Sequence, residues 1–389
     1  MYKIFIVITV LTIGLTACTK QKVASLQTEY QQTVAKIAYA NYNDAYLTAV
    51  TLRESINVLI ESPSQNTLDA AKEAWLAARE AYGQSEVFRF QEGPIDDVNG
   101  PEGLLNAWPL DEAYIDYVDG NTTAGIINDP SIEITPELLE NANENGGEKN
   151  ISVGYHAIEF LLWGQDDANT ALMTPGNRPF TDFVTDGTGT ASNQDRRGEY
   201  LKICADLLVD HLAYVKNQWA ENGIYRRTFI EMDAKAAIDK ILTGMGILSK
   251  SELASERMFV ALDNQDQEDE HSCFSDNTHR DVILNAQGIY NLYFGTYTTI
   301  DGQTISGTSI QDILAKAEKD KEENYTAVFT ETLAAVKEIP APFDYALTQE
   351  AIGGNGPIMT AIKKLQNQGN EIANLASDLD LIISTELPE

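Results

Sequence analysis

Apolar residues recur every three or four positions through most of the chain, which is the spacing of amphipathic helices. The expected helices cover 24–61, 67–82, 151–163, 196–221, 227–248, 251–263, 275–293, 309–338, 343–351 and 356–384, with a hairpin-like loop at 295–308. Asn66 or Thr67 is the expected cap of the second helix, and Ser275 that of the helix it begins. Thr135 and Pro136 start a further short helix. Alternating strand patterns are rare, so we predict an all-α fold.

The helices fall into two groups, each with a long loop and one short helix that bears a histidine near a carboxylate. Breaks over 91–110 and 164–195 interrupt the first group, and Asn222-Gly223 separates the groups. We therefore expect an N-terminal bundle over 24–220 and a C-terminal bundle over 225–389.

The N-terminus looks like a lipoprotein signal. Lys3 precedes an apolar run of about 12 residues, which is too short to span a bilayer. The run ends in Leu-Thr-Ala-Cys at Cys18, similar to a bacterial lipobox, although a chance cysteine after a secretory signal would look the same. We expect 1–17 to be removed, Cys18 to carry an acyl anchor, and 18–23 to link it to the fold.

These features predict a protein of the bacterial cell envelope that meets a membrane only through its lipid. No later stretch reaches the roughly 18 apolar residues of a membrane helix. Thr19-Lys20 lacks the aspartate of an inner-membrane retention signal, which favours the outer membrane. The sequence leaves open whether the protein faces the periplasm or the cell surface.

Acidic residues outnumber basic ones by 59 to 27, giving a net charge of −32. Such a surface repels phosphate backbones and anionic lipid, which excludes nucleic acid as a partner, and it concentrates cations. The 43% of apolar residues is enough for a sizeable core. Beyond Cys18 only Cys204 and Cys273 remain, and their spacing leaves open whether they pair or stay as buried thiols.

The first candidate for chemistry is His156 with Glu159. On a helix, residues three apart share a face, and Trp163 follows one turn later. The neighbours are almost all apolar, and a buried carboxylate is costly unless it is paired or binds a cation. An imidazole and a carboxylate at this spacing suit iron or zinc in a helical bundle. A purely structural hydrogen bond between the two side chains is the alternative.

The second candidate is Asp276 with His279. If Ser275 caps the helix, these two side chains also share one inward face, although Asp276 would equally suit the positive end of the helix dipole. His271 follows three acidic residues and is expected to be solvated. His211 is expected to belong to ordinary helix surface or core.

At three blocks the sequence resembles the imelysin family. Gly154-x-His156-x-x-Glu159 matches the G-x-H-x-x-E signature of that family. The other two blocks are Phe274-Ser275-Asp276-Asn277-Thr278-His279, and Gly100-Pro101-Glu102 with Asn106-Ala107-Trp108-Pro109-Leu110-Asp111. The resemblance covers about 35–385 and implies two helical bundles with the site near their interface. It implies functional roles for His156 and Glu159 from the first block, and for Ser275, Asp276 and His279 from the second. Asp111 and Trp163 are possible lining residues.

The resemblance leaves three functions open. In the first, an iron-uptake lipoprotein binds iron, or zinc as the second choice of metal, through His156 and Glu159, while Asp276 and His279 reach the same cleft. Its partners would be iron or an iron chelate and an outer-membrane or periplasmic iron-transport component. The second is a metal-dependent peptidase of the imelysin type, although the chain has no H-E-x-x-H motif. The third is a partner-binding surface lipoprotein with a purely structural His–Glu pair.

Overall fold

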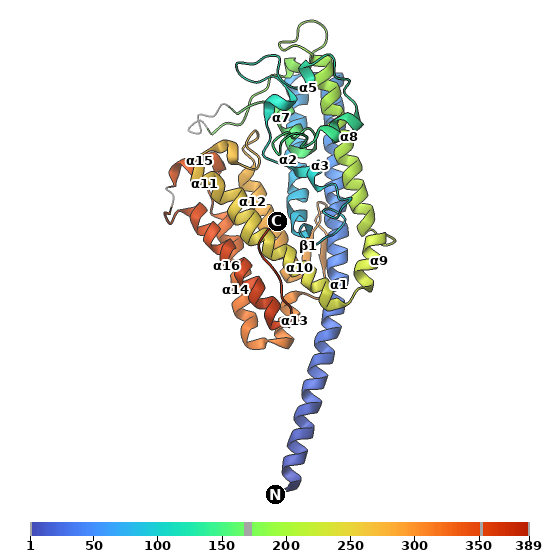
Figure 1. Cartoon of the computed structure of the whole chain (residues 1–389), viewed down its shortest axis with the longest axis vertical. Coiled ribbons are helices and arrows are strands. Elements are labelled where there is room, and N and C mark those ends of the chain that lie inside the picture. The colour runs from blue at the N-terminus through green and yellow to red at the C-terminus, as the bar shows by residue number, and fades with distance from the viewer. Residues whose placement is uncertain (1, 167–172, 351–352, 388–389) are drawn as a thin grey trace.

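The computed structural model (Figure 1) describes the backbone over 2–166, 173–350 and 353–387, and side chains from residue 20 onward within these ranges. Its α-helices are α1 (Tyr2–Glu61), α2 (Gln65–Ser85), α3 (Glu102–Asn106), α4 (Glu112–Ile115), α5 (Gly125–Asn128), α6 (Pro136–Ala142), α7 (Gly154–Trp163), α8 (Gln194–Trp219), α9 (Ile224–Glu231), α10 (Ala234–Ile247), α11 (Val260–Asn264), α12 (Thr278–Phe294), α13 (Ile310–Ala317), α14 (Lys319–Lys337), α15 (Phe343–Gln349) and α16 (Pro357–Asp378). Shorter or irregular elements are the 3-10 turns η1 (Glu86–Phe88), η3 (Phe180–Phe183) and η5 (Gln267–Asp269), and the π-helix η4 (Leu248–Phe259). Strands β1 (Thr296–Thr298) and β2 (Thr304–Ser306) pair antiparallel at the expected hairpin. The predicted all-α fold is confirmed.

The helices pack against neighbours from both halves of the chain. α1 lies against α2 and α8, α12 packs on α2, and α16 packs on η4 and α14 (Figure 1). The largest hydrophobic core contains side chains from both expected bundles, among them Tyr30, Leu208 and Leu292. A smaller core lies among η4, α11, α14, α15 and α16. The division into bundles over 24–220 and 225–389 stays a prediction.

The N-terminal part of α1 extends beyond the other helices (Figure 1). It contains residues 2–17 of the segment whose removal stays a prediction. Among the residues described, no helix is both long and apolar enough to cross a membrane.

Two expected helix boundaries are confirmed, one of them by a capping contact. α1 ends at Glu61, two residues before Pro63. The Thr135 hydroxyl accepts a hydrogen bond from the amide of Leu138 at the start of α6. The cap of α2 was predicted wrongly, because Ser64 takes that position in a reciprocal capping box with Thr67, so the expected cap lies inside the first turn.

Two expected long helices are broken by local side-chain chemistry. The pattern over 227–248 divides into α9 and α10, because the Asp233 carboxylate accepts hydrogen bonds from the amides of Lys235 and Ala236 and starts a new helix. The pattern over 309–338 divides into α13 and α14 at Glu318, whose φ of −138° leaves the helical region. The expected loop over 91–110 also contains a helix, α3, which carries a residue of the site.

Candidate functional site

α7 lies wholly inside the molecule, with every residue buried. Gly154 begins it with a φ of 89°, and a Cβ atom at this position would lie 2.6 Å from the carbonyl oxygen of Leu105 in α3. Glycine is therefore required for the helix to start so close to α3. One turn along, His156 and Glu159 share a face, as their spacing predicted.

Glu159 links α7 to the segment before α12. Its Oε2 lies 2.9 Å from His156 Nδ1, and its Oε1 accepts hydrogen bonds from the Ser275 amide at 3.0 Å and the Ser275 hydroxyl at 2.7 Å. The prediction that Ser275 caps the helix is therefore wrong, and α12 begins three residues later at Thr278. A fully buried carboxylate needs hydrogen-bond donors more than a helix end near solvent does.

The remaining nitrogen of His156, Nε2, is buried and has no hydrogen-bond partner among the residues that the structure describes. Burial, reinforced by the Arg79 charge, lowers the pKa of His156 to about 3, so the ring is neutral at pH 7. Burial raises the pKa of Glu159 to about 8, although the hydrogen bonds from Ser275 act to lower it. At pH 7 the Glu159 carboxyl is therefore mostly protonated and donates to Nδ1, which places the ring proton on Nε2. When Glu159 ionises, the Nδ1–H donates to it instead and Nε2 becomes an unpaired acceptor.

His271 also belongs to this interior, so its prediction as a solvated side chain is wrong. Its ring is buried, with Nδ1 2.8 Å from Asp281 Oδ2 and Nε2 3.3 Å from the Asn106 amide nitrogen. Trp108 lies edge-on against the ring, with centroids 5.2 Å apart. Burial, together with the Arg257 charge, lowers the pKa of His271 well below its usual value, so this ring is neutral as well.

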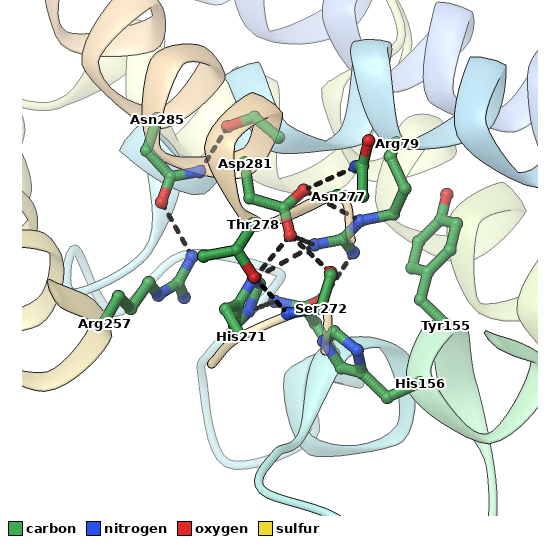
Figure 2. Close-up of polar contacts among 12 residues, drawn as sticks. Arg79, Tyr155, His156, Arg257, His271, Ser272, Asn277, Thr278, Asp281 and Asn285 are labelled. Carbon is green, nitrogen blue, oxygen red and sulfur yellow. Dashed lines mark hydrogen bonds and ion pairs between the residues drawn. The ribbon is translucent and has the colours of Figure 1, made fainter. Parts of the chain in front are cut away.

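Asp281 is the centre of the polar cluster beside the two histidines. Figure 2 shows Arg79, His271 and Ser272 converging on its carboxylate. Arg79 forms an ion pair with it at 3.1 Å, and the Ser272 hydroxyl donates to it at 2.5 Å. Arg79 also donates to Asn106 Oδ1 at 2.6 Å. These contacts join α2, α3 and α12 around one buried charge.

The two imidazole rings are in edge-to-face contact inside this cluster. The ring centroids of His156 and His271 are 4.7 Å apart and the rings are nearly perpendicular, at 77°. Two neutral rings, each hydrogen-bonded through Nδ1 to a carboxyl group, are therefore in edge-to-face contact in the buried interior.

Asp276 and His279 lie outside this interior. Asp276 precedes α12 with a φ of 56°, so the two do not share a helical turn as predicted, and the His279 Nδ1–H donates to the Asp276 carbonyl oxygen at 3.0 Å. With Ser275 they line an open groove of about 520 Å³. Burial, then the neighbouring carboxylates Asp344 and Asp166, raise the pKa of Asp276 to about 7. Ser275 thus separates an inner pair, His156 and Glu159, from an outer pair, Asp276 and His279.

The other predicted lining residues have local roles. Asp111 caps α4 by accepting the Ala113 amide at 3.1 Å. Trp163 ends α7 with its ring 5.3 Å from that of Trp75, away from the polar cluster. Cys18 lies within α1, outside the described side chains.

The other histidine and the two further cysteines also lie outside the cluster. His211 is half-buried on α8, with Nε2 2.8 Å from Glu140 Oε1. Cys204 and Cys273 are free thiols.

Sequence reasoning missed Arg79, Asn106 and Asp281 as site residues. Asn106 belongs to a block that resembles the imelysin family, and Asp281 lies two residues after another such block, so that resemblance could have identified both. Arg79 carries no local signal, because it sits in an ordinary amphipathic pattern on α2. Over the residues described, no three or more His, Cys, Asp or Glu side chains are grouped so as to hold a metal ion.

The chain was compared with known proteins. It is 24% identical over 345 residues to the iron-regulated protein A of Synechococcus elongatus, covering 89% of this chain and 84% of that protein. A crystal structure from Parabacteroides distasonis, provisionally named an iron-regulated protein A precursor, has a similar fold. Its TM-score is 0.70 at 20% identity, over 91% of this chain and 95% of that one. The family model for imelysin, which carries a peptidase label, matches residues 38–374. The chain therefore belongs to the imelysin family.

Proposed function

We propose that this protein binds iron or an iron chelate in the bacterial cell envelope, with His156 as the donor at its buried site. The orphaned Nε2 of His156 carries the proposal. When Glu159 gives up its proton, the neutral His156 ring donates its Nδ1–H to the carboxylate and presents Nε2 as metal-ligating histidines do. Glu159 would fix the ring and supply negative charge, and zinc remains the second choice of metal.

Two further observations support an iron-related role. Relatives of this chain carry the name iron-regulated protein A. The outer pair, Asp276 and His279, places a carboxylate and an imidazole in the open groove that adjoins Ser275. An entering cation would meet these two side chains before the inner pair. Cys18 would hold the protein at the membrane, most simply the outer one, where an iron-transport component would be its partner.

The geometry supports binding better than peptide hydrolysis. The hydroxyls of Ser272 and Ser275 both donate to carboxylates, so no imidazole activates either as a nucleophile. A metallopeptidase would need a base beside an open metal position, and Glu159 is already engaged by His156 and Ser275.

Elemental analysis and titration of the untagged protein with ferrous ion, ferric citrate and zinc test the proposal. We expect stoichiometric iron that is lost in His156→Ala and kept in His211→Ala, a matched change at a histidine outside the site. Glu159→Gln, which keeps the shape of the side chain, should weaken binding at least tenfold. Equal affinity in the wild-type and His156→Ala proteins would leave the His–Glu pair with a purely structural role.

A further inference from the structure

A second cavity, of about 680 Å³, lies on elements other than those of the histidine site. It opens between α1, the turn from α8 to α9, and the loop of the β1–β2 hairpin, which runs beside α1 in Figure 1. Tyr39, Leu47 and Ile300 form its apolar wall and are 38%, 44% and 54% exposed. A cavity of this size with an apolar wall and a few polar groups is typical of small-molecule sites.

Asp44 supplies an uncompensated negative charge to this cavity. The residue is only 4% exposed, and its Oδ2 accepts hydrogen bonds from the Tyr297 hydroxyl at 2.9 Å and the Ile300 amide at 3.0 Å. Both donors use the same oxygen, and in the described chain Oδ1 has no hydrogen bond and no basic side chain pairs with Asp44. Burial raises the pKa of this carboxyl, as expected for a charge that lacks a cation.

Two basic side chains line the same cavity without carboxylate partners. Arg226 is held by hydrogen bonds from one terminal nitrogen to the carbonyl oxygens of Ala35 at 2.9 Å and Trp219 at 3.1 Å. Neither its guanidinium nor the Lys36 ammonium forms an ion pair with any described acidic residue.

Two further acidic residues, Glu221 and Asp301, line the cavity. The Asp301 carboxylate accepts hydrogen bonds from Thr299 and from Gln303, the latter at 2.9 Å, and is satisfied within the hairpin. Glu221 is an exposed residue of the turn between α8 and α9. The cavity lining therefore holds one buried carboxylate, Asp44, two further acidic residues, two basic residues and an apolar wall.

We propose that this cavity binds a short zwitterionic peptide, with its N-terminal ammonium on Asp44 and its carboxylate near Lys36 and Arg226. A simple amine would leave the two cations unpaired, and a simple carboxylate would leave Asp44 unpaired. In a single amino acid the ammonium and the carboxylate are attached to the same carbon, whereas in a peptide they lie at opposite ends of the molecule. Apolar side chains of the peptide would cover Leu47 and Ile300, and the Tyr39 ring is a favourable neighbour for an ammonium group.

Calorimetric titration of the full chain with the dipeptide Leu-Leu tests the proposal. N-acetyl-Leu-Leu lacks the ammonium, and Leu-Leu amide lacks the carboxylate. We expect saturable binding of Leu-Leu that weakens at least tenfold on acetylation and several-fold on amidation. Binding should weaken to the same degrees in Asp44→Asn and Lys36→Gln respectively. Asp44→Asn keeps an oxygen for Tyr297 and Ile300, so the hairpin should remain folded, which circular dichroism checks.

Two controls separate this site from other effects. Lys22→Gln changes an exposed lysine of α1 outside the cavity and should leave binding unchanged. His156→Ala should also have no effect, which keeps this result independent of the proposed iron site. Equal binding of Leu-Leu and its acetylated form, an unaltered affinity in Asp44→Asn, or no saturable binding at millimolar dipeptide would overturn the proposal.

Discussion

Replacing Asp281 with asparagine tests how strongly the buried ion pair joins α2 to α12 at the candidate site. Asp281 accepts the Arg79 Nε–H at 3.2 Å and the Ser272 hydroxyl at 2.5 Å, and lies 2.8 Å from His271 Nδ1. The Asp281→Asn variant keeps the shape of the side chain but leaves Arg79 buried without a counter-charge. Removing one member of a buried ion pair costs about 3–5 kcal/mol, so the free energy of unfolding should fall by about that amount.

The same two helices provide a matched control one residue away. Arg280 of α12 binds Glu80 of α2 through two hydrogen bonds at 2.8 and 2.7 Å, but these side chains are 38% and 45% exposed. Exposed pairs contribute about 0–1 kcal/mol, so Arg280→Gln should lower the free energy of unfolding by less than about 1 kcal/mol. Urea unfolding followed by tryptophan fluorescence measures both variants. Equal losses would refute the view that burial of the Arg79–Asp281 pair sets its contribution.

Three further changes test acid stability, helix packing and anchoring. Burial acts to raise the pKa of Glu86, but the Arg257 charge outweighs burial and the pKa falls to about 2. The ionised Glu86 carboxylate therefore stabilises the fold above pH 4.5, and this contribution is lost as the pH falls towards 2. This carboxylate should account for a loss of about 3 kcal/mol in the free energy of unfolding between pH 4.5 and 2, and Glu86→Gln should remove that pH dependence, as urea unfolding measures. Gly154→Ala should lower the melting temperature more than Gly120→Ala, because both have positive φ but only the former meets a backbone oxygen, a contrast that calorimetry measures. Cys18→Ser should move the protein from the membrane to the soluble fraction, and retention at the membrane would contradict lipid anchoring.

The parts of the site that the sequence predicts are those set within one helical turn. His156 and Glu159 are three residues apart on a single apolar helix, so their contact follows from helix geometry. The helix ends at Pro63 and Gly164 were predictable for the same reason. The positive φ of Gly154 was not predicted, because the close approach that requires it is to Leu105 of α3, far from Gly154 in the sequence.

The parts that the sequence did not predict depend on partners far along the chain. His271 follows a run of acidic residues, which favours solvent, yet Arg79 reaches it from 192 positions away. Ser275 is a good helix cap by residue type, but its hydroxyl donates to Glu159, 116 positions away. In both cases a buried charge, absent from any local window, decides where the side chain points.

The charge pattern of the interior distinguishes Glu159 from its neighbours. Arginine lies against Asp281 and Glu86, and the pKa of each of these carboxyls is lowered although both are fully buried. Glu159 is equally buried but has only a neutral imidazole and a serine as hydrogen-bond partners, and its pKa is raised. A site built solely for stability could have placed an arginine here as well. Within the described chain no arginine hydrogen-bonds to Glu159, and the Arg79 charge that acts on it does not offset its burial. Together with the unpartnered Nε2 of His156, this is consistent with the cation-binding role that we propose.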